Sequence, residues 1–174
     1  MKSQPVYTVN YAAISDIDEV HHFFQEKLSS LLFYNALART SEADHYNMLN
    51  LKAMLDHDPR SVIVARGKGR LKGICFNRFD DYTIWLSWII VDNSRDGDGS
   101  SLRRGVGSAI LNKLNESALE RNCRKVWCDC RTDNLTGIEF LKKNGYSILC
   151  EIKNHWYRQD FLLLERMSLG GDKK

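Results

Sequence analysis

The sequence predicts an α/β fold, with a mixed, mostly antiparallel central sheet of about six to seven strands that is flanked by helices. Some segments have apolar residues at every second position or in short continuous runs, as strands do. Between them lie segments whose apolar residues recur at helical spacing. Three of the strands follow one another with short turns between them, which is typical of an antiparallel meander. A strand followed by a helix and a second strand implies one parallel pair within the sheet.

The first part of the chain is expected to form one strand and two helices. Residues 6–12 alternate between apolar and polar side chains, as in a half-buried strand. Ser15 with Asp18 resembles a capping pair, and it opens a helix that runs through about residue 32. Ser41 with Asp44 opens a second helix in the same way, through about residue 57.

The rest of the chain supplies most of the sheet. The meander covers residues 61–66, 72–79 and 83–91, and its third strand is apolar on both faces, so we expect that strand to lie centrally. Gly145 occupies the position that follows a helix end, with Lys142 and Lys143 in the last turn of that helix. The remaining elements are a helix at about 105–121, a strand at 125–130, a helix at about 134–144, and strands at 147–152 and 160–166.

Length and composition indicate one domain covering residues 1–174, with enough apolar residues for a core. The longest apolar run has ten residues, about half of a membrane span, and no signal-peptide pattern precedes the first strand. The five cysteines are odd in number and form no C-x-x-C pair, which favours reduced thiols and no metal site. We therefore expect a cytoplasmic protein that binds neither membranes nor metals.

Charge is unevenly distributed along the chain. Residues 1–60 contain five Lys or Arg against eight Asp or Glu, whereas residues 61–174 contain 20 against 14. An acidic first part would suit a cationic acceptor, although solvated helix surfaces account for the same charges. No basic stripe with interleaved aromatic residues occurs, so nucleic acid is not an expected partner.

A turn rich in glycine and arginine opens the helix near residue 105. Arg103 and Arg104 precede Gly105, and Gly107 follows after one residue. Both glycines are expected to take positive φ and to let the backbone approach a ligand closely. The free N–H groups of the first helical turn and the two arginines then predict a phosphate site. A plain loop with a glycine turn is the alternative.

Three known phosphate or metal motifs do not fit this turn. A dinucleotide-binding fingerprint needs a third glycine where the chain has Ile110, and the Gly-Lys-Ser/Thr of a nucleotide phosphate loop is missing. A calcium loop over residues 94–105 would begin with Ser94 and end with Gly105, where a Glu is required. A solvated insertion explains this stretch better.

The order of elements together with this turn resembles the GNAT superfamily of N-acetyltransferases, which use acetyl-CoA. The family's pyrophosphate motif corresponds to residues 102–107, where both glycines match and Leu102 replaces the usual Arg or Gln. The resemblance also implies that backbone groups of Ile89, Ile90 and Val91 contact the pantetheine arm, as an added strand would. It thus implies a mixed sheet of the GNAT type.

A second matching stretch is the helix at about 134–144. Asn134, Phe140 and the Gly-Tyr that ends the stretch fit the family pattern, whereas Leu141 stands where many members place a tyrosine that protonates the departing thiolate. The implied acetyl-CoA site comprises Ile89, Ile90, Val91, Arg103, Arg104, Gly105, Val106, Gly107, Ser108, Asn134, Phe140 and Lys143.

The implied reaction is direct attack by a neutral primary amine on the acetyl thioester in a ternary complex. A lysine-type amine costs roughly 4 to 5 kcal/mol to deprotonate at pH 7 and an α-amine about 1 kcal/mol. Since residues 84–91 contain no carboxylate, a low-pKa amine or a base from another element is favoured. His155 and Tyr157 are the catalytic candidates, and Asp129 and Asp81 are weaker ones that more often serve as ion-pair partners.

Other functions remain open at this point. The acetyltransferase is the leading hypothesis. Leu102, Leu141 and the carboxylate-free strand favour a second one, a CoA-binding sensor or partner subunit without activity. A nucleotide-dependent enzyme that uses the same turn is a third, weaker alternative. The acceptor amine, on a small molecule or a protein, is not identified, and exposed strands at the sheet edge would suit a homodimer. The apolar residues near 31–37 would cover the acceptor only if the early helices fold over a split in the sheet.

Overall fold

A computed structural model describes residues 7–92 and 105–168. These residues form a seven-stranded mixed sheet with the order β1-β2-β3-β4-β5-β7-β6, in which β4 and β5 are parallel and all other neighbours are antiparallel. The predicted fold class is therefore confirmed. The strands are β1 (Tyr7–Tyr11), β2 (Val62–Gly67), β3 (Arg70–Asp80), β4 (Thr83–Val91), β5 (Lys125–Arg131), β6 (Ser147–Ile152) and β7 (Phe161–Met167).

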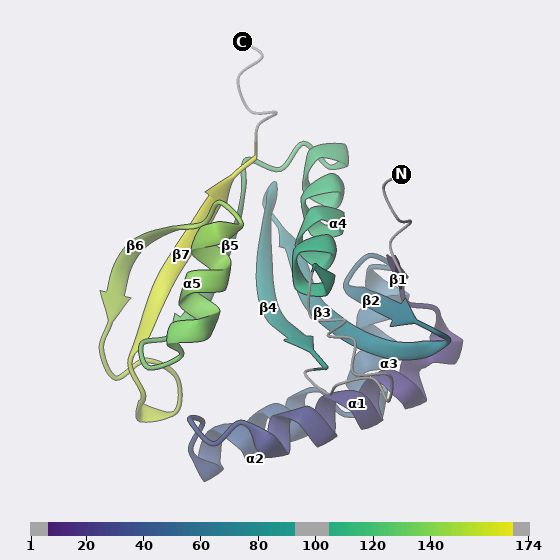
Figure 1. Ribbon diagram of the computed structural model, residues 1–174, viewed down its shortest axis with the longest axis horizontal. Helices are drawn as coiled ribbons and strands as arrows, with labels where there is room; N and C mark the ends of the chain where they lie inside the picture. Colours follow the sequence, from purple (N-terminus) through teal and green to yellow (C-terminus); the bar gives the residue numbers. More distant parts are fainter. Residues whose placement is uncertain (1–6, 93–104, 169–174) are drawn as a thin grey trace.

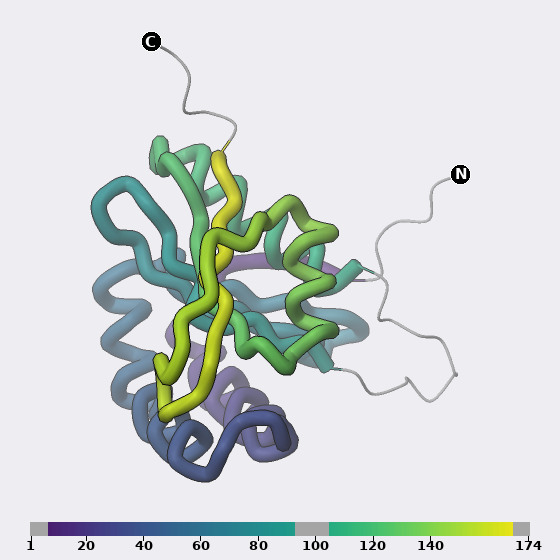
Figure 2. Tube along the Cα trace, turned by 90° about the vertical axis from the view of Figure 1, so that its left-hand side faces the viewer, coloured from purple at the N-terminus to yellow at the C-terminus, as the bar shows by residue number. Residues whose placement is uncertain are grey.

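Five helices of the described chain cover the two faces of the sheet. Helices α4 and α5 lie on one face, and α1, α2 and α3 lie on the other (Figures 1 and 2). No helix within these ranges is both long and apolar enough to cross a membrane. The helices are α1 (Ile17–Ser30), α2 (Ala36–His45), α3 (Met48–His57), α4 (Val106–Glu120) and α5 (Leu135–Lys143), with short 3₁₀ turns at Ile14–Asp16 and Trp156–Arg158.

Each face of the sheet has its own core. On the α4 side, Ile110 and Leu114 recur one helical turn apart and are fully buried against sheet residues such as Ile84. On the other side, Phe24 of α1 contacts Trp88 of β4 at 5.4 Å between ring centroids. Burying each of these large side chains stabilises the fold by about 1.5 to 3 kcal/mol.

The early helices differ from those expected. The predicted helix at 41–57 is instead two helices, because the Asn47 side chain accepts a hydrogen bond from the N–H of Asn50 and starts α3 anew. Asn35 starts α2 in the same way, so Ser41 lies inside that helix. Asn is a strong N-cap residue, and here two Asn caps prevail over the local periodicity. The expected Ser15 cap is also wrong, because the chain there forms the 3₁₀ turn before α1.

The parallel strands β4 and β5 separate partway along their length. They pair only at Thr83↔Lys125, Ile84↔Val126 and Trp85↔Trp127, although β4 continues to Val91 and β5 to Arg131. A bulge in β4, where Ser87 is the extra residue opposite Phe76 and Asn77, coincides with this separation. Figure 1 shows the resulting split between the two strands.

A bidentate ion pair joins α3 and α4 at their carboxyl ends. Arg121 donates to both oxygens of Asp58, at 2.8 and 2.6 Å. Burial raises the pKa of Asp58, but the hydrogen bonds and charge of Arg121 outweigh that effect, so the pKa lies below its ordinary value.

Replacing this carboxylate is expected to destabilise the fold in a pH-dependent manner. Asp58→Asn should lower the free energy of unfolding by about 1 to 2 kcal/mol at pH 7. Because the folded-state pKa is depressed, the stabilisation is present above the unfolded-state pKa of about 3.9 and is lost as the pH falls through the lower folded value. Urea unfolding of the parent chain and the variant at pH 7 and at acidic pH measures the loss of stability and its pH dependence. Asp81→Asn, at an exposed ion pair with Arg124, is the control and should show almost no effect.

Candidate active site

The start of α4 presents unpaired backbone donors beside the split. Gly105 has φ 108° and precedes the helix, and the first hydrogen bond of the helix runs from the N–H of Ala109 to the carbonyl of Gly105. The N–H groups of Val106, Gly107 and Ser108 therefore have no partner within the helix, and no side chain caps it among the described residues. Such an array binds anions, and it fits the pyrophosphate of a CoA molecule.

The two glycines of this turn have different roles. Gly105 takes the expected positive φ, and a Cβ there would lie 2.6 Å from the Tyr7 hydroxyl. The prediction of positive φ is wrong for Gly107, which lies within α4. A Cβ on Gly107 would lie 2.9 Å from the ring of Phe140, so this glycine is needed for close packing of α5 against the start of α4. Arg103 and Arg104 lie outside the described residues.

Helix α5 carries the second stretch that the sequence singled out. Asn134 caps this helix, because its side-chain oxygen accepts a hydrogen bond from the N–H of Gly137 at 3.0 Å. Gly145 has φ 87° and follows the helix end, as predicted. Leu141 is buried in the core on this face, and Lys143 is exposed in the last turn.

The free segment of β4 forms one side of the split. Ile89 and Val91 pack toward α4, whereas Ile90 is buried on the face that α1 covers. All three residues follow the last residue pair between β4 and β5, so this edge of β4 is not paired with β5. A strand that binds an extended ligand needs such an unpaired edge.

A carboxylate from α2 lies on the other face of the split. Glu42 accepts a hydrogen bond from the Tyr157 hydroxyl at 2.5 Å and one from the indole of Trp88 at 2.8 Å. Burial raises the pKa of Tyr157, and the hydrogen bond to Glu42 raises it further, so this phenol stays protonated. The sequence did not single out Glu42, since one acidic residue in an amphipathic helix resembles any solvated charge.

A second carboxylate, Asp129, lies in β5 just beyond its last pair with β4. The indole of Trp156 donates to its Oδ2 at 2.6 Å, and Nε2 of His155 lies 3.8 Å from the same oxygen. Burial raises the pKa of Asp129, while Trp156 and His155 lower it and the charge of Glu42 raises it further. A buried carboxyl with a raised pKa is a suitable base nearer to neutral pH.

Loops from distant parts of the chain hold these groups together. The side chain of Asn35 donates to the carbonyl of Tyr157 at 2.8 Å, and the side chain of Gln159 donates to the carbonyl of Phe33 at 3.3 Å. Tyr34, between them, has a raised pKa because it is buried and because Asp129 lies near. The early helices thus fold over the split, as covering the acceptor would require.

The structure sorts the sequence-predicted candidates into two groups. His155 and Tyr157 lie with Asp129 and Glu42, each beside a different carboxylate. Asp81 lies elsewhere, at an exposed turn, where it pairs with Arg124. Among residues 7–92 and 105–168, no three His, Cys, Asp or Glu side chains gather as metal ligands would.

Comparisons with known proteins identify the family and the fold of this chain. The model of the Acetyltransferase (GNAT) family matches residues 26–146, whereas no curated protein gives a significant match. Among solved structures, Ard1 from Thermoplasma volcanium is 22% identical, with a TM-score of 0.73 over 94% of this chain and 99% of that one.

Two further structures share the fold. The paia N-acetyltransferase from Thermoplasma acidophilum, solved in complex with coenzyme A, is 12% identical, with a TM-score of 0.72 over 92% of this chain and 98% of that chain. The ribosomal-protein-alanine N-acetyltransferase from Brucella melitensis is 18% identical, with a TM-score of 0.71 over 92% and 99%. From the family match, the chain belongs to the GNAT acetyltransferase family and is an acyltransferase.

Proposed function

We propose that this chain transfers the acetyl group of acetyl-CoA to a primary amine, by direct attack of the neutral amine in a ternary complex. One observation carries the proposal: the split between β4 and β5 has free helix N–H groups near one face and two carboxylates on the other. A phosphate-bearing acyl donor and a cationic acceptor would meet there from opposite sides.

The donor side uses backbone groups and the surfaces around them. We assign the pyrophosphate to the N–H groups of Val106, Gly107 and Ser108, and the pantetheine arm to the free edge of residues 89–91. Arg103, Arg104, Asn134, Phe140 and Lys143 stay proposed members of this site. Acetyl-CoA supplies an acyl group activated as a thioester, with a thiol leaving group of pKa about 8.5.

The acceptor side supplies the proton acceptor. Asp129 takes the proton from the bound ammonium, and His155 beside it passes the proton toward solvent. The negative charge of Glu42 favours binding of the acceptor amine in its cationic form. Tyr157 orients Glu42 by its hydrogen bond. The neutral amine then forms the C–N bond as the C–S bond breaks.

The acceptor is an amine of a small molecule or of a protein. The Brucella melitensis protein is named for a ribosomal-protein alanine as its acceptor. Among protein amines, an α-amine has a lower pKa than a lysine side chain, so less free energy is needed to deprotonate it. The cytoplasmic location, the single domain and a homodimer through exposed edge strands stay predictions.

The donor site is tested by a charge in the first turn of α4. Acetyl-CoA at 100 times its Kd should stabilise the parent chain by about 2 to 3 kcal/mol in thermal unfolding. Ser108→Glu should lose most of this, because its carboxylate repels the pyrophosphate while suiting a helix start without ligand. Ser108→Gln is the matched neutral control and should retain it. A parent chain that acetyl-CoA does not stabilise would overturn the proposal.

Leu141 favours one alternative function. A buried leucine occupies the position at which the resemblance implies a tyrosine acid, and this would suit a CoA-binding sensor or partner subunit without activity. Release of the free CoA thiol across a panel of amines separates the two functions. Amine-dependent release above hydrolysis supports the transferase, and stabilisation without such release supports the sensor.

A further inference from the structure

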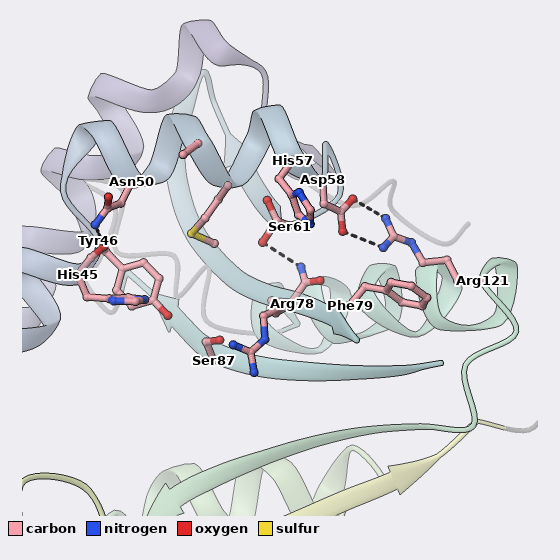
Figure 3. A pocket seen from close by; sticks show the side chains of 13 residues that line it. His45, Tyr46, Asn50, His57, Asp58, Ser61, Arg78, Phe79, Ser87 and Arg121 are labelled. Carbon is pink, nitrogen blue, oxygen red and sulfur yellow. Dashed lines mark hydrogen bonds and ion pairs between the residues drawn. The ribbon is translucent and has the colours of Figure 1, made fainter. Parts of the chain in front are cut away.

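A cavity of about 670 Å³ opens between α3 and strands β3 and β4 (Figure 3). Its walls combine aromatic and polar side chains from four parts of the chain. Those used below are Tyr46, Ser61, Arg78, Phe79 and Ser87. This volume lies within the range of small-molecule sites in proteins.

The cavity borders the carboxylate side of the candidate active site. The bulge interrupts the alternation of β4, so Ser87 lines the cavity while Trp88, the next residue, donates to Glu42. Tyr46, the residue that follows α2, lies between the two regions. Burial raises its pKa, a hydrogen bond with the Ser87 side chain lowers it, Glu42 raises it and Arg78 lowers it. Its phenol therefore lies within the fields of both Glu42 and Arg78.

The cavity contains a cationic group without a charge partner. Arg78 is exposed, and its side chain forms no hydrogen bond or ion pair with any residue in the described ranges. Its guanidinium extends beside Ser87 (Figure 3). Arg121, the other arginine of the lining, donates to both oxygens of Asp58. Arg78 thus supplies the unbalanced positive charge of the lining.

A buried hydroxyl in the same wall also lacks a partner. Ser61 is 4% exposed, and its Oγ has no hydrogen-bond partner among the described residues. A buried polar atom without a partner costs about 1 to 3 kcal/mol. Because neighbouring atoms cover this Oγ, it does not face the cavity itself.

We propose that this cavity binds an anionic group, a carboxylate or a phosphate, of an acceptor whose primary amine lies at Asp129 and Glu42. The inference rests on the proposed acetyl transfer and narrows its acceptors to molecules with both charges. Arg78 pairs with the anion, and the walls at Phe79 and Tyr46 contact the carbon chain between the two charges.

The first experiment compares acceptors that differ only at the far end. Straight-chain amines ending in a carboxylate, a phosphate or a methyl group, each at several lengths, are assayed with acetyl-CoA for kcat/KM. We expect an optimal length at which an anionic acceptor exceeds the methyl-ended amine by about 10- to 100-fold. The carboxylate and phosphate arms identify which anion is bound. Equal kcat/KM for charged and uncharged acceptors at every length would overturn the inference.

Variants then connect this preference to the cavity. Arg78→Gln should reduce kcat/KM for the anionic acceptor by about 10-fold or more through KM, and leave that of the methyl-ended amine unchanged. Arg78→Lys should restore part of the preference, and Arg124→Gln, at a surface arginine, is the matched control and should change neither. Ser61→Ala is a second control at the cavity wall. It should change neither the preference nor the Tm, since it removes a covered hydroxyl that has no protein partner.

Binding without turnover separates this inference from the proposed function. The carboxylate-ended, phosphate-ended and methyl-ended amines are each titrated into the parent chain and into Arg78→Gln with no acetyl-CoA present. If amines are acetylated but Arg78 has no effect on either measurement, the anion site is wrong and the transferase stands. If no amine is acetylated but the anionic acceptor binds in an Arg78-dependent manner, the anion site stands and the amine transfer is wrong.

Discussion

Asp129→Asn is expected to lower kcat by about 10²- to 10³-fold while leaving the Kd of acetyl-CoA unchanged. The carboxylate lies in β5 just past the last pair with β4, beside His155, and burial raises its pKa, as a base acting nearer to neutral pH requires. Asparagine keeps an oxygen to accept the hydrogen bond from Trp156, so the loop stays in place and only the proton acceptor is lost.

The same substitution is expected to raise the Tm at pH 7. A carboxyl whose folded-state pKa lies above its unfolded value binds protons more tightly in the folded chain, so stability falls as the pH rises from the unfolded to the folded pKa. Above both values the full cost of burying the charge at Asp129 is present, and asparagine removes it. A protein that is more stable and less active is typical of a substituted functional group.

Thermal unfolding tests the expected rise in Tm, and the pH dependence of kcat/KM tests the role of Asp129 as the base. The parent chain should lose activity as acid protonates Asp129, at a pH above the ordinary carboxyl pKa of about 3.9, and the variant should lack this acid limb. Asp81→Asn, a surface carboxyl at a distant turn, should change neither activity nor Tm appreciably. A lower Tm together with an unchanged acid limb would assign Asp129 a structural role instead.

Local signals explain why the turns at the start of α4 and at the end of α5 could be predicted. A positive-φ glycine before an amphipathic helix, and another after one, depend on residues within a few positions of each other, and both Gly105 and Gly145 have the expected conformation. The strands follow from short apolar runs between turns. The break between α2 and α3 was missed because the Asn47 cap competes with a continuous helical pattern, and the sequence alone does not rank the two.

The acceptor side depends on contacts that no local pattern encodes. Glu42 and Tyr157 are 115 positions apart, and their hydrogen bond exists only because the early helices lie over the split. The sequence pattern favours an ion-pair partner for Asp129 but does not identify one, and the fold supplies an indole N–H and an imidazole from residues far along the chain. The bulge at Ser87 lies between the Arg78 cavity and Trp88, which donates to Glu42, and it likewise depends on how β3 pairs with β4.

Leu114→Ala is expected to lower the free energy of unfolding by about 2 to 5 kcal/mol, a large part of the 5 to 15 kcal/mol typical of a domain. Leu114 is 0% exposed in the core that fixes α4 to the sheet. Leu119→Ala, on the same helix but 48% exposed, is the matched control and should cost below about 1 kcal/mol. Urea unfolding measures both.

The stabilisation of Leu114→Ala by acetyl-CoA shows whether the packing of α4 and its ligand binding are independent. The free N–H groups of α4 lie nearly two turns before Leu114, so acetyl-CoA at 100 times its Kd should still add about 2 to 3 kcal/mol to the weakened chain. Loss of that increment would mean that the first turn of α4 is held by the core beneath Leu114 and not by its own backbone conformation. The pyrophosphate site at the start of α4 would then depend on the sheet contacts of the whole helix. The positive-φ glycine at residue 105 would not be sufficient to form this site.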